Sequence, residues 1–267
     1  MKFPPLRFSP AKPVLVIRTG HAPKPIRARH GDFAHWFCLA ARLPSSQVRV
    51  VDVTAGEQLP APDDVAGALI TGSAAMVTER ATWSERTAGW IRNAMDAELP
   101  MFGICFGHQL MAHALGGRVD YLSGGREIGT LPIRFLADAP LDALTEGMPA
   151  SFRAHTTHEQ SVVEIPADAT VLARSDRDPN HLLRYGKQAY SAQFHPEFNA
   201  EVMRAYIRRK HADMQREGSD PRRIFREVAA TPVARGLFRR FVQLHMGPNI
   251  ADIPANSVAQ AASHGVA

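Results

Sequence analysis

Short, continuous runs of apolar residues recur along the first half of the chain. They cover residues 13–18, 66–70 and 100–104, and a valine-rich, partly alternating run covers residues 47–53. Runs of this length are typical of strands buried in a parallel sheet. Between them, residues 31–42 and 83–97 have apolar positions close to helical spacing. The pattern therefore predicts alternating strands and helices, as in an α/β fold.

The periodicity changes in the second half. Short alternating segments predict further strands at residues 118–121, 130–135, 170–173, 181–185 and 190–194. Two helices should follow, one capped by Asn199 and running to about residue 211, and one opening at Thr231-Pro232. The second helix should pack through Val233, Leu237, Phe241 and Leu244. We expect an N-terminal extension (1–12), a main domain (13–212), C-terminal helices packed on it (213–247) and a flexible tail (248–267).

Cys105 follows the apolar run 100–104 and stands between Gly103 and Gly107. A strand that reverses into a helix within three residues needs glycines on both sides of the turning residue, because a Cβ there would strike the neighbouring backbone. The turn would place the sulfur at the N-terminus of a helix beginning near Phe106, where free N–H groups and the helix dipole favour a thiolate. Cys105 is therefore a candidate nucleophile. A cysteine that only packs in the core would not need the two glycines.

The segment 103–109, Gly-Ile-Cys-Phe-Gly-His-Gln, resembles the nucleophile elbow of class I (triad-type) glutamine amidotransferases. A cysteine nucleophile needs a base within reach and a third group to orient that base. The segment 193–197, Gln-Phe-His-Pro-Glu, resembles the family's second signature, in which the histidine is the base and the glutamate orients it. The resemblance covers residues 13–206, and the chain looks similar to the glutaminase part of GMP synthase. It implies a flavodoxin-like mixed, mostly parallel central sheet with helices on both faces, and a catalytic triad of Cys105, His195 and Glu197.

Attack on an amide carbonyl builds negative charge on its oxygen, and each preorganised N–H donor stabilises that charge by about 3 to 4 kcal/mol. The elbow offers the N–H of Phe106 as one donor. The turn at 69–73 resembles the family's oxyanion strand and indicates the N–H of Gly72 as the other. The family often has two adjacent glycines where this chain has Thr71-Gly72.

The same resemblance implies residues that hold the substrate. Gln109 should line the glutamine pocket, and Ser73 lies in the oxyanion turn. Glu127, in a Gly-x-Glu-x-Gly segment, should pair with the ammonium of the substrate. His158 and Glu159 belong to a stretch in which the family usually has aspartate at the position of Glu159.

Composition limits the alternatives. With 267 residues, 45% of them hydrophobic, the chain can form one large α/β domain. Two cysteines, Cys38 and Cys105, do not make a disulfide framework. We see no apolar run long enough to cross a bilayer and no signal-peptide core, and we expect a cytoplasmic protein.

We expect neither metal nor cofactor. The pairs His155 with His158 and His108 with His113 lack further ligands at established spacing. No phosphate-binding glycine motif of the Rossmann or P-loop type is present, so the chain has no visible ATP site.

The net charge is +5, and residues 201–240 hold eleven Lys and Arg against five Asp and Glu. The resemblance implies that ammonia released from L-glutamine passes to a separate synthetase or ligase. Such a partner could dock on this basic segment, for example at Arg208, Arg209 and Arg222, although a solvated helical face is the simpler interpretation. We expect no nucleic acid or membrane partner. Two other functions stay open: a γ-glutamyl peptide or γ-glutamyl amine hydrolase, and a catalytically idle regulatory protein that keeps the fold.

Overall fold

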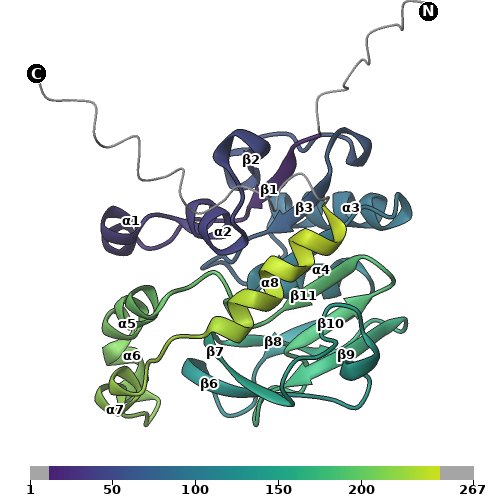
Figure 1. The fold of residues 1–267 in the computed structure, drawn as a ribbon. Helices are drawn as coiled ribbons and strands as arrows, with labels where there is room; N and C mark the ends of the chain where they lie inside the picture. Colours follow the sequence, from purple (N-terminus) through teal and green to yellow (C-terminus); the bar gives the residue numbers. More distant parts are fainter. Residues whose placement is uncertain (1–11, 247–267) are drawn as a thin grey trace, which may run out of the picture.

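A nine-stranded mixed sheet runs through the centre of the computed structural model, which describes residues 12–246 (Figure 1). Its strands are β1 (Val14–Arg18), β2 (Val48–Asp52), β3 (Gly67–Ile70), β4 (Met101–Ile104), β6 (Glu127–Phe135), β7 (Ser151–His158), β9 (Ala169–Arg174), β10 (Leu182–Tyr185) and β11 (Ala189–Ala192). They lie in the order β2-β1-β3-β4-β11-β10-β9-β6-β7. The strands from β2 to β11 are mutually parallel, and the remaining pairs are antiparallel. The parallel part has the flavodoxin-like strand order, which confirms the expected fold class.

A small antiparallel pair, β5 (Arg118–Tyr121) and β8 (Gln160–Glu164), lies beside this sheet. The helices are α1 (Lys24–His30), α2 (Phe33–Ala41), α3 (Thr82–Asp96), α4 (Phe106–Ala114), α5 (Ala200–Arg209), α6 (His211–Arg216), α7 (Pro221–Arg226) and α8 (Pro232–His245). None of these helices is long and apolar enough to span a bilayer.

Both faces of the parallel part of the sheet are covered, which explains why its strands are continuous apolar runs. In β1, Val14 and Val16 belong to the core cluster that contains α2 and α8, whereas Leu15 and Ile17 belong to the cluster that contains α3 and α4. Figure 1 shows α8 crossing in front of the sheet and α4 behind it. A third cluster joins α1 and α2 to α5 through residues such as Phe198.

The C-terminal helix packs through a different face from the one expected. Leu237 and Phe241 are fully buried as predicted, together with Phe238 and Val242, but Leu244 is 49% exposed. The prediction for Leu244 was wrong. The buried face of α8 follows two series of i, i+4 positions, 234-238-242 and 237-241. Residue 244 lies outside this face.

Several elements were missed from the sequence. Helix α1 buries only Ile26, so it has almost no apolar periodicity. Strands β7 and β8 contain buried polar residues, among them His155 and Thr156, which hide the alternation of a strand. The expected domain border at residue 212 falls inside α6. The predicted extension (1–12) and tail (248–267) lie, except for Lys12, outside the described residues.

Candidate active site

Three neighbouring parallel strands end at the same edge of the sheet, and each leads into one candidate residue. Strand β3 leads to Gly72, β4 to Cys105 and β11 to His195. The Cys105 amide donates to the Ala192 carbonyl at 2.8 Å. The His195 amide donates to the carbonyl of His155 on β7, also at 2.8 Å. The carboxyl edge of a parallel sheet is where such folds place their ligand sites.

The elbow at Cys105 has the strained backbone that a nucleophile turn requires. Its φ of +54° and ψ of −102° are unfavourable for a residue with a Cβ. A Cβ on Gly103 would lie 2.5 Å from the Gly107 carbonyl oxygen, and a Cβ on Gly107 would lie 2.5 Å from the Ile70 carbonyl oxygen. Both glycines are therefore needed to bring α4 so close to β3 and β4.

His195 is oriented by Glu197, whose Oε1 lies 2.7 Å from the ring Nδ1. Both residues are 2% exposed. Burial alone would lower the pKa of His195, but the Glu197 carboxylate and Cys105 outweigh it and raise this pKa above its ordinary value. The ring of Phe198 stacks on the imidazole, with centroids 4.0 Å apart. The imidazole is thus fixed in place, and Nε2 has no hydrogen-bond partner in the described part of the chain.

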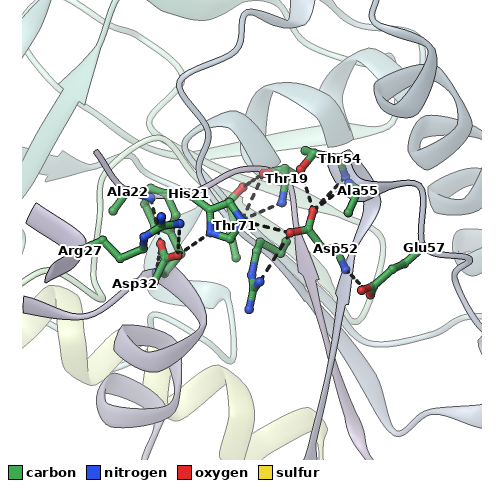
Figure 2. Close-up of polar contacts among 12 residues, drawn as sticks. Thr19, His21, Ala22, Arg27, Asp32, Asp52, Thr54, Ala55, Glu57 and Thr71 are labelled. Carbon is green, nitrogen blue, oxygen red and sulfur yellow. Dashed lines mark hydrogen bonds and ion pairs between the residues drawn. The ribbon is translucent and has the colours of Figure 1, made fainter. Parts of the chain in front are cut away.

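Gly72 lies between the cysteine and the histidine. A Cβ there would be 3.2 Å from His195 Cε1 and 3.7 Å from Cys105 Cβ. The carbonyl of Thr71 accepts a hydrogen bond from the Thr19 hydroxyl at 2.9 Å (Figure 2). Because the C=O and N–H of one peptide unit point in opposite directions, the Gly72 N–H is turned away from Thr19. Neither this N–H nor that of Phe106 donates to another residue in the range 12–246.

A cavity of about 170 Å³ opens above these groups. Cys105, Phe106 and His195 line it, and so do four of the predicted substrate residues: Ser73, Gln109, His158 and Glu159. Gln109 has a defined orientation, because its Nε2 donates to the Gln160 carbonyl at 2.7 Å and to Gln193 Oε1 at 3.0 Å. Both amide hydrogens are used, which leaves the carbonyl oxygen of Gln109 to accept from a ligand.

A family model described as "Glutamine amidotransferase class-I" matches residues 33–214. The matched stretch contains the Gly72 turn, the Cys105 elbow and the His195-Pro196-Glu197 segment. The chain belongs to the class I glutamine amidotransferase family. This confirms the resemblance found in the sequence.

Proteins named as GMP synthase subunits and as γ-glutamyl peptidases are both similar to this chain. A glutamine-hydrolysing GMP synthase subunit from Methanopyrus kandleri is 36% identical over 141 residues, which cover 51% of this chain and 71% of that protein. The γ-glutamyl peptidase 5 of Arabidopsis thaliana is 31% identical over 143 residues, which cover 53% of this chain and only 57% of that protein. A solved glutamine amidotransferase from Thermotoga maritima has a TM-score of 0.68 and 22% identity, and covers 88% of this chain and 98% of its own. The last similarity concerns the fold alone.

Glu127 does not line this cavity. Its side chain is 2% exposed, and both oxygens already accept hydrogen bonds. Oε1 accepts from the Ser175 hydroxyl at 2.6 Å, and Oε2 lies 3.1 Å from His158 Nε2 and 2.9 Å from His181 Nε2. The structure therefore does not bring Glu127 to the ammonium of a substrate, since partners from β7 and from the residue before β10 occupy the carboxylate.

Helix α5 and the residue that follows it contribute three cavity residues, of which the sequence analysis named only Arg209, as part of the basic segment. Tyr206, Arg209 and Lys210 line the cavity. Lys210 Nζ lies 3.4 Å from Glu159, which also pairs with Arg126 at 2.6 Å. Arg209 has no carboxylate partner among the described residues. The i, i+3 and i+4 spacing within the predicted helix at 199–211 was the available signal that these three side chains share a face.

The loop before α1 also reaches the cavity, through His21 and Pro23. His21 bridges two carboxylates: Nδ1 lies 2.6 Å from Asp32 and Nε2 lies 3.1 Å from Asp52 (Figure 2). Asp32 caps α2 and also accepts from the Ala22 amide. His21 thereby ties the cavity loop to the start of α2 and the end of β2.

One group of side chains within residues 12–246 has ligand atoms close enough to hold a metal ion. It consists of Glu127, His158 and His181, whose ligand atoms lie within 4.8 Å of one another. Neither histidine pair considered from the sequence forms such a group. His108 contacts the Ser191 hydroxyl at 2.7 Å, and His113 lies 3.1 Å from Glu85.

Proposed function

We propose that the chain hydrolyses L-glutamine to glutamate and ammonia through a γ-glutamyl thioester on Cys105. The observation that supports this best is the strained cysteine elbow beside the buried His195–Glu197 pair, at the floor of a cavity lined by Gln109. An idle binding protein would gain nothing from a strained backbone at Cys105.

In this proposal the Cys105 sulfur attacks the side-chain carbonyl carbon of glutamine. The N–H groups of Gly72 and Phe106 stabilise the oxygen anion that forms. His195 gives its proton to the leaving nitrogen, and ammonia departs as the thioester forms. His195 then takes a proton from water as the water attacks the thioester, and glutamate leaves with the thiolate restored.

The cavity offers partners for both charged groups of the substrate. The carbonyl oxygen of Gln109 suits the α-ammonium, and the Glu159 carboxylate also lines the cavity. Arg209, the cavity-lining cation without a carboxylate partner in the described chain, suits the α-carboxylate. Ser73 and His158 complete the walls.

Hydrolysis of γ-glutamyl peptides is the second candidate. It is favoured by the relatives named γ-glutamyl peptidase, one of which is 31% identical. Arg209 and Lys210 at the cavity would also suit a leaving group with its own carboxylate. A γ-glutamyl amine would lack that group, so the two classes can be separated by assay.

The first prediction tests the nucleophile. Cys105→Ala should lower glutamate release from glutamine and from a panel of γ-glutamyl peptides and amines by at least about a thousand-fold, because the covalent route is lost. Cys38→Ala, a half-buried cysteine on α2, is the matched control and should keep its activity. A glutamine-mimicking diazo-ketone should label Cys105 alone. Turnover in Cys105→Ala near the wild-type level would disprove the proposal.

We also propose that a separate synthetase or ligase receives the ammonia, as the name of the GMP synthase relative suggests. A reducing compartment such as the cytoplasm would keep the Cys105 thiol reduced and reactive.

Not all basic side chains of residues 201–240 are available for a partner, because Arg235, Arg239 and Arg240 donate hydrogen bonds to backbone carbonyls. Arg209 lines the cavity, so it cannot serve to test docking alone.

The second prediction therefore concerns α7. A partner co-purified from the host should stimulate glutamine hydrolysis, and the stimulation should fade as salt rises, because complementary charge mainly speeds association. Reversing the exposed Arg222, Arg223 and Arg226 to Glu should remove it without changing basal turnover. Reversing Arg49, exposed on the edge strand β2, is the control. Stimulation that survives both salt and the α7 reversal would leave this helix as a solvated face.

A further inference from the structure

Strands β1 and β3 run parallel and side by side, and each is followed directly by the dipeptide Thr-Gly. These dipeptides are Thr19-Gly20 after β1 and Thr71-Gly72 after β3. Both threonines are fully buried, and their hydroxyl oxygens lie 3.1 Å apart (Figure 2). A buried hydroxyl is costly without a hydrogen-bond partner, so each of these two hydrogens should have an acceptor.

The hydrogen bonds of this threonine pair have one arrangement that satisfies every group. The amide of Thr19 donates to the Thr71 hydroxyl oxygen at 3.0 Å. The Thr71 hydroxyl donates in turn to the carbonyl of Gly72 at 3.1 Å. The Thr19 hydroxyl donates to the carbonyl of Thr71 at 2.9 Å, its shortest hydrogen bond. No backbone amide among residues 12–246 donates to either carbonyl, so the two carbonyls depend on these hydroxyl groups.

The direction of the Thr71 carbonyl sets the direction of the Gly72 amide. In a trans peptide unit the C=O and N–H groups point in opposite directions, and no cis peptide bond occurs among residues 12–246. The Thr71 carbonyl points toward Thr19, on the side of β1. Because β3 lies between β1 and β4, the Gly72 N–H points toward the side of β4, the strand that leads to Cys105.

This arrangement gives a reason for Thr71-Gly72 where the family often has two adjacent glycines. A glycine at position 71 would lack the hydroxyl that accepts from the Thr19 amide and donates to the Gly72 carbonyl. Gly20 in turn lets the loop after β1 lie against this turn, because a Cβ there would be 2.7 Å from Ser73 Oγ. The two Thr-Gly dipeptides are therefore complementary.

We propose that Thr19 is a positioning residue for the oxyanion hole: its hydroxyl orients the peptide unit between Thr71 and Gly72 so that the Gly72 N–H is directed to the oxygen of the substrate. Thr19 is fully buried and does not line the cavity, so it acts without touching the substrate. The part of this inference that concerns turnover rests on the proposed function, whereas the hydrogen bond from Thr19 to the Thr71 carbonyl does not.

Nuclear magnetic resonance tests that hydrogen bond, because Thr-Gly occurs only twice in the sequence. In protein labelled with carbonyl-¹³C threonine and ¹⁵N glycine, only the amides of Gly20 and Gly72 are coupled to a labelled carbonyl. Thr19→Val removes the Gly20 signal and so identifies that of Gly72. A hydrogen bond to a carbonyl oxygen deshields its carbon, so the Thr71 carbonyl signal should move upfield in Thr19→Val and stay in place in Thr19→Ser. An unmoved signal in Thr19→Val would overturn the proposal, whether or not glutamine is hydrolysed.

Kinetics test the effect on the transition state. Thr19→Val should lower kcat for glutamine by about ten- to a hundred-fold and change KM by less than about three-fold, because the Gly72 N–H stabilises charge that forms only during the attack. Thr19→Ser keeps the hydroxyl and should restore kcat to near the wild-type value. Alkylation of Cys105 by iodoacetamide forms no oxyanion, so its rate should be the same in wild type and in both variants.

Thr145→Val is the matched control, since Thr145 is also buried, donates to the Ala139 carbonyl and does not line the cavity. It should lower stability while leaving kcat and the Thr71 carbonyl signal unchanged. A loss of kcat in Thr145→Val or Thr19→Ser as large as that in Thr19→Val would reduce Thr19 to a structural residue.

A second variant covers the case in which Thr19→Val does not fold. Thr71→Val leaves the Gly72 carbonyl without its donor and the Thr19 amide without its acceptor, so it should also lower kcat with little change in KM. Wild-type kcat in Thr71→Val would overturn the proposal. If the wild-type protein hydrolyses no γ-glutamyl compound, the proposed function fails, while the Thr71 carbonyl signal still decides whether Thr19 orients this peptide unit.

Discussion

The carboxylate of Glu197 has the strongest stabilising effect on a positive charge at His195. Because this carboxylate is the largest influence that raises the histidine pKa, its removal should lower that pKa. In the proposed mechanism this imidazolium protonates the leaving group, and it would then be lost at a lower pH. We predict that Glu197→Gln shifts the alkaline limb of the pH–kcat/KM profile toward acid and lowers kcat by more than it affects KM.

Profiles of kcat/KM against pH for wild type and Glu197→Gln measure this shift. Glu201→Gln, at an exposed carboxylate bonded to Arg204, is the control and should leave the profile unchanged. An unchanged alkaline limb in Glu197→Gln would show that Glu197 does not set the charge of His195.

The strand-to-helix turn after β4 depends on a backbone approach that only glycine permits. Since a Cβ on Gly107 would lie 2.5 Å from the Ile70 carbonyl oxygen, α4 would have to move away from β3. We predict that Gly107→Ala lowers the free energy of unfolding by about 1 to 3 kcal/mol and also impairs turnover, because the Phe106 N–H moves with the helix.

Gly236, in α8, supplies the matched comparison because nothing lies within 4 Å of an added Cβ. Gly236→Ala should raise the free energy of unfolding by up to about 1 kcal/mol through helix propensity. Urea unfolding of both variants measures the contrast. Equal effects of the two substitutions would contradict the close approach of α4 to β3.

Buried histidines couple the stability of the whole molecule to pH. Burial lowers the pKa of His108 to about 3 and that of His155 to about 4. Below pH 6.5 the unfolded chain takes up protons at these sites while the folded protein does not, so stability falls by about 1.4 kcal/mol per pH unit for each histidine. His195, whose pKa is raised, acts in the opposite sense. Its stabilisation is complete below pH 6.5 and is lost as pH rises through the raised pKa.

We therefore predict that the free energy of unfolding is highest near neutral pH and falls steeply toward pH 4. Urea unfolding at a series of pH values measures this curve. His108→Asn should reduce the acid slope by the contribution of one histidine. A flat curve between pH 7 and pH 5 would mean that the folded protein takes up these protons as readily as the unfolded chain.

Features that depend only on residues close together in the chain could be predicted from the sequence alone. The apolar runs of β1, β3 and β4 predict strands because burial on both faces leaves no polar position. The glycines around Cys105 predict the elbow because a tight turn involves only a few consecutive residues, and Gly103 and Gly107 are both among them. The His195-Pro196-Glu197 segment is likewise contiguous.

Contacts between groups far apart in the chain could not be predicted in this way, because they depend on how the chain packs. Glu127 belongs to a recognisable motif, but its partners His158 and His181 are 31 and 54 residues away in the sequence. Their hydrogen bonds hold the carboxylate away from the cavity. Arg209 belongs by composition to a basic segment, but the packing of α5 places it at the cavity. Hydrogen bonds and charge pairs depend on distances in space, and a one-dimensional pattern does not record the register and packing that set those distances.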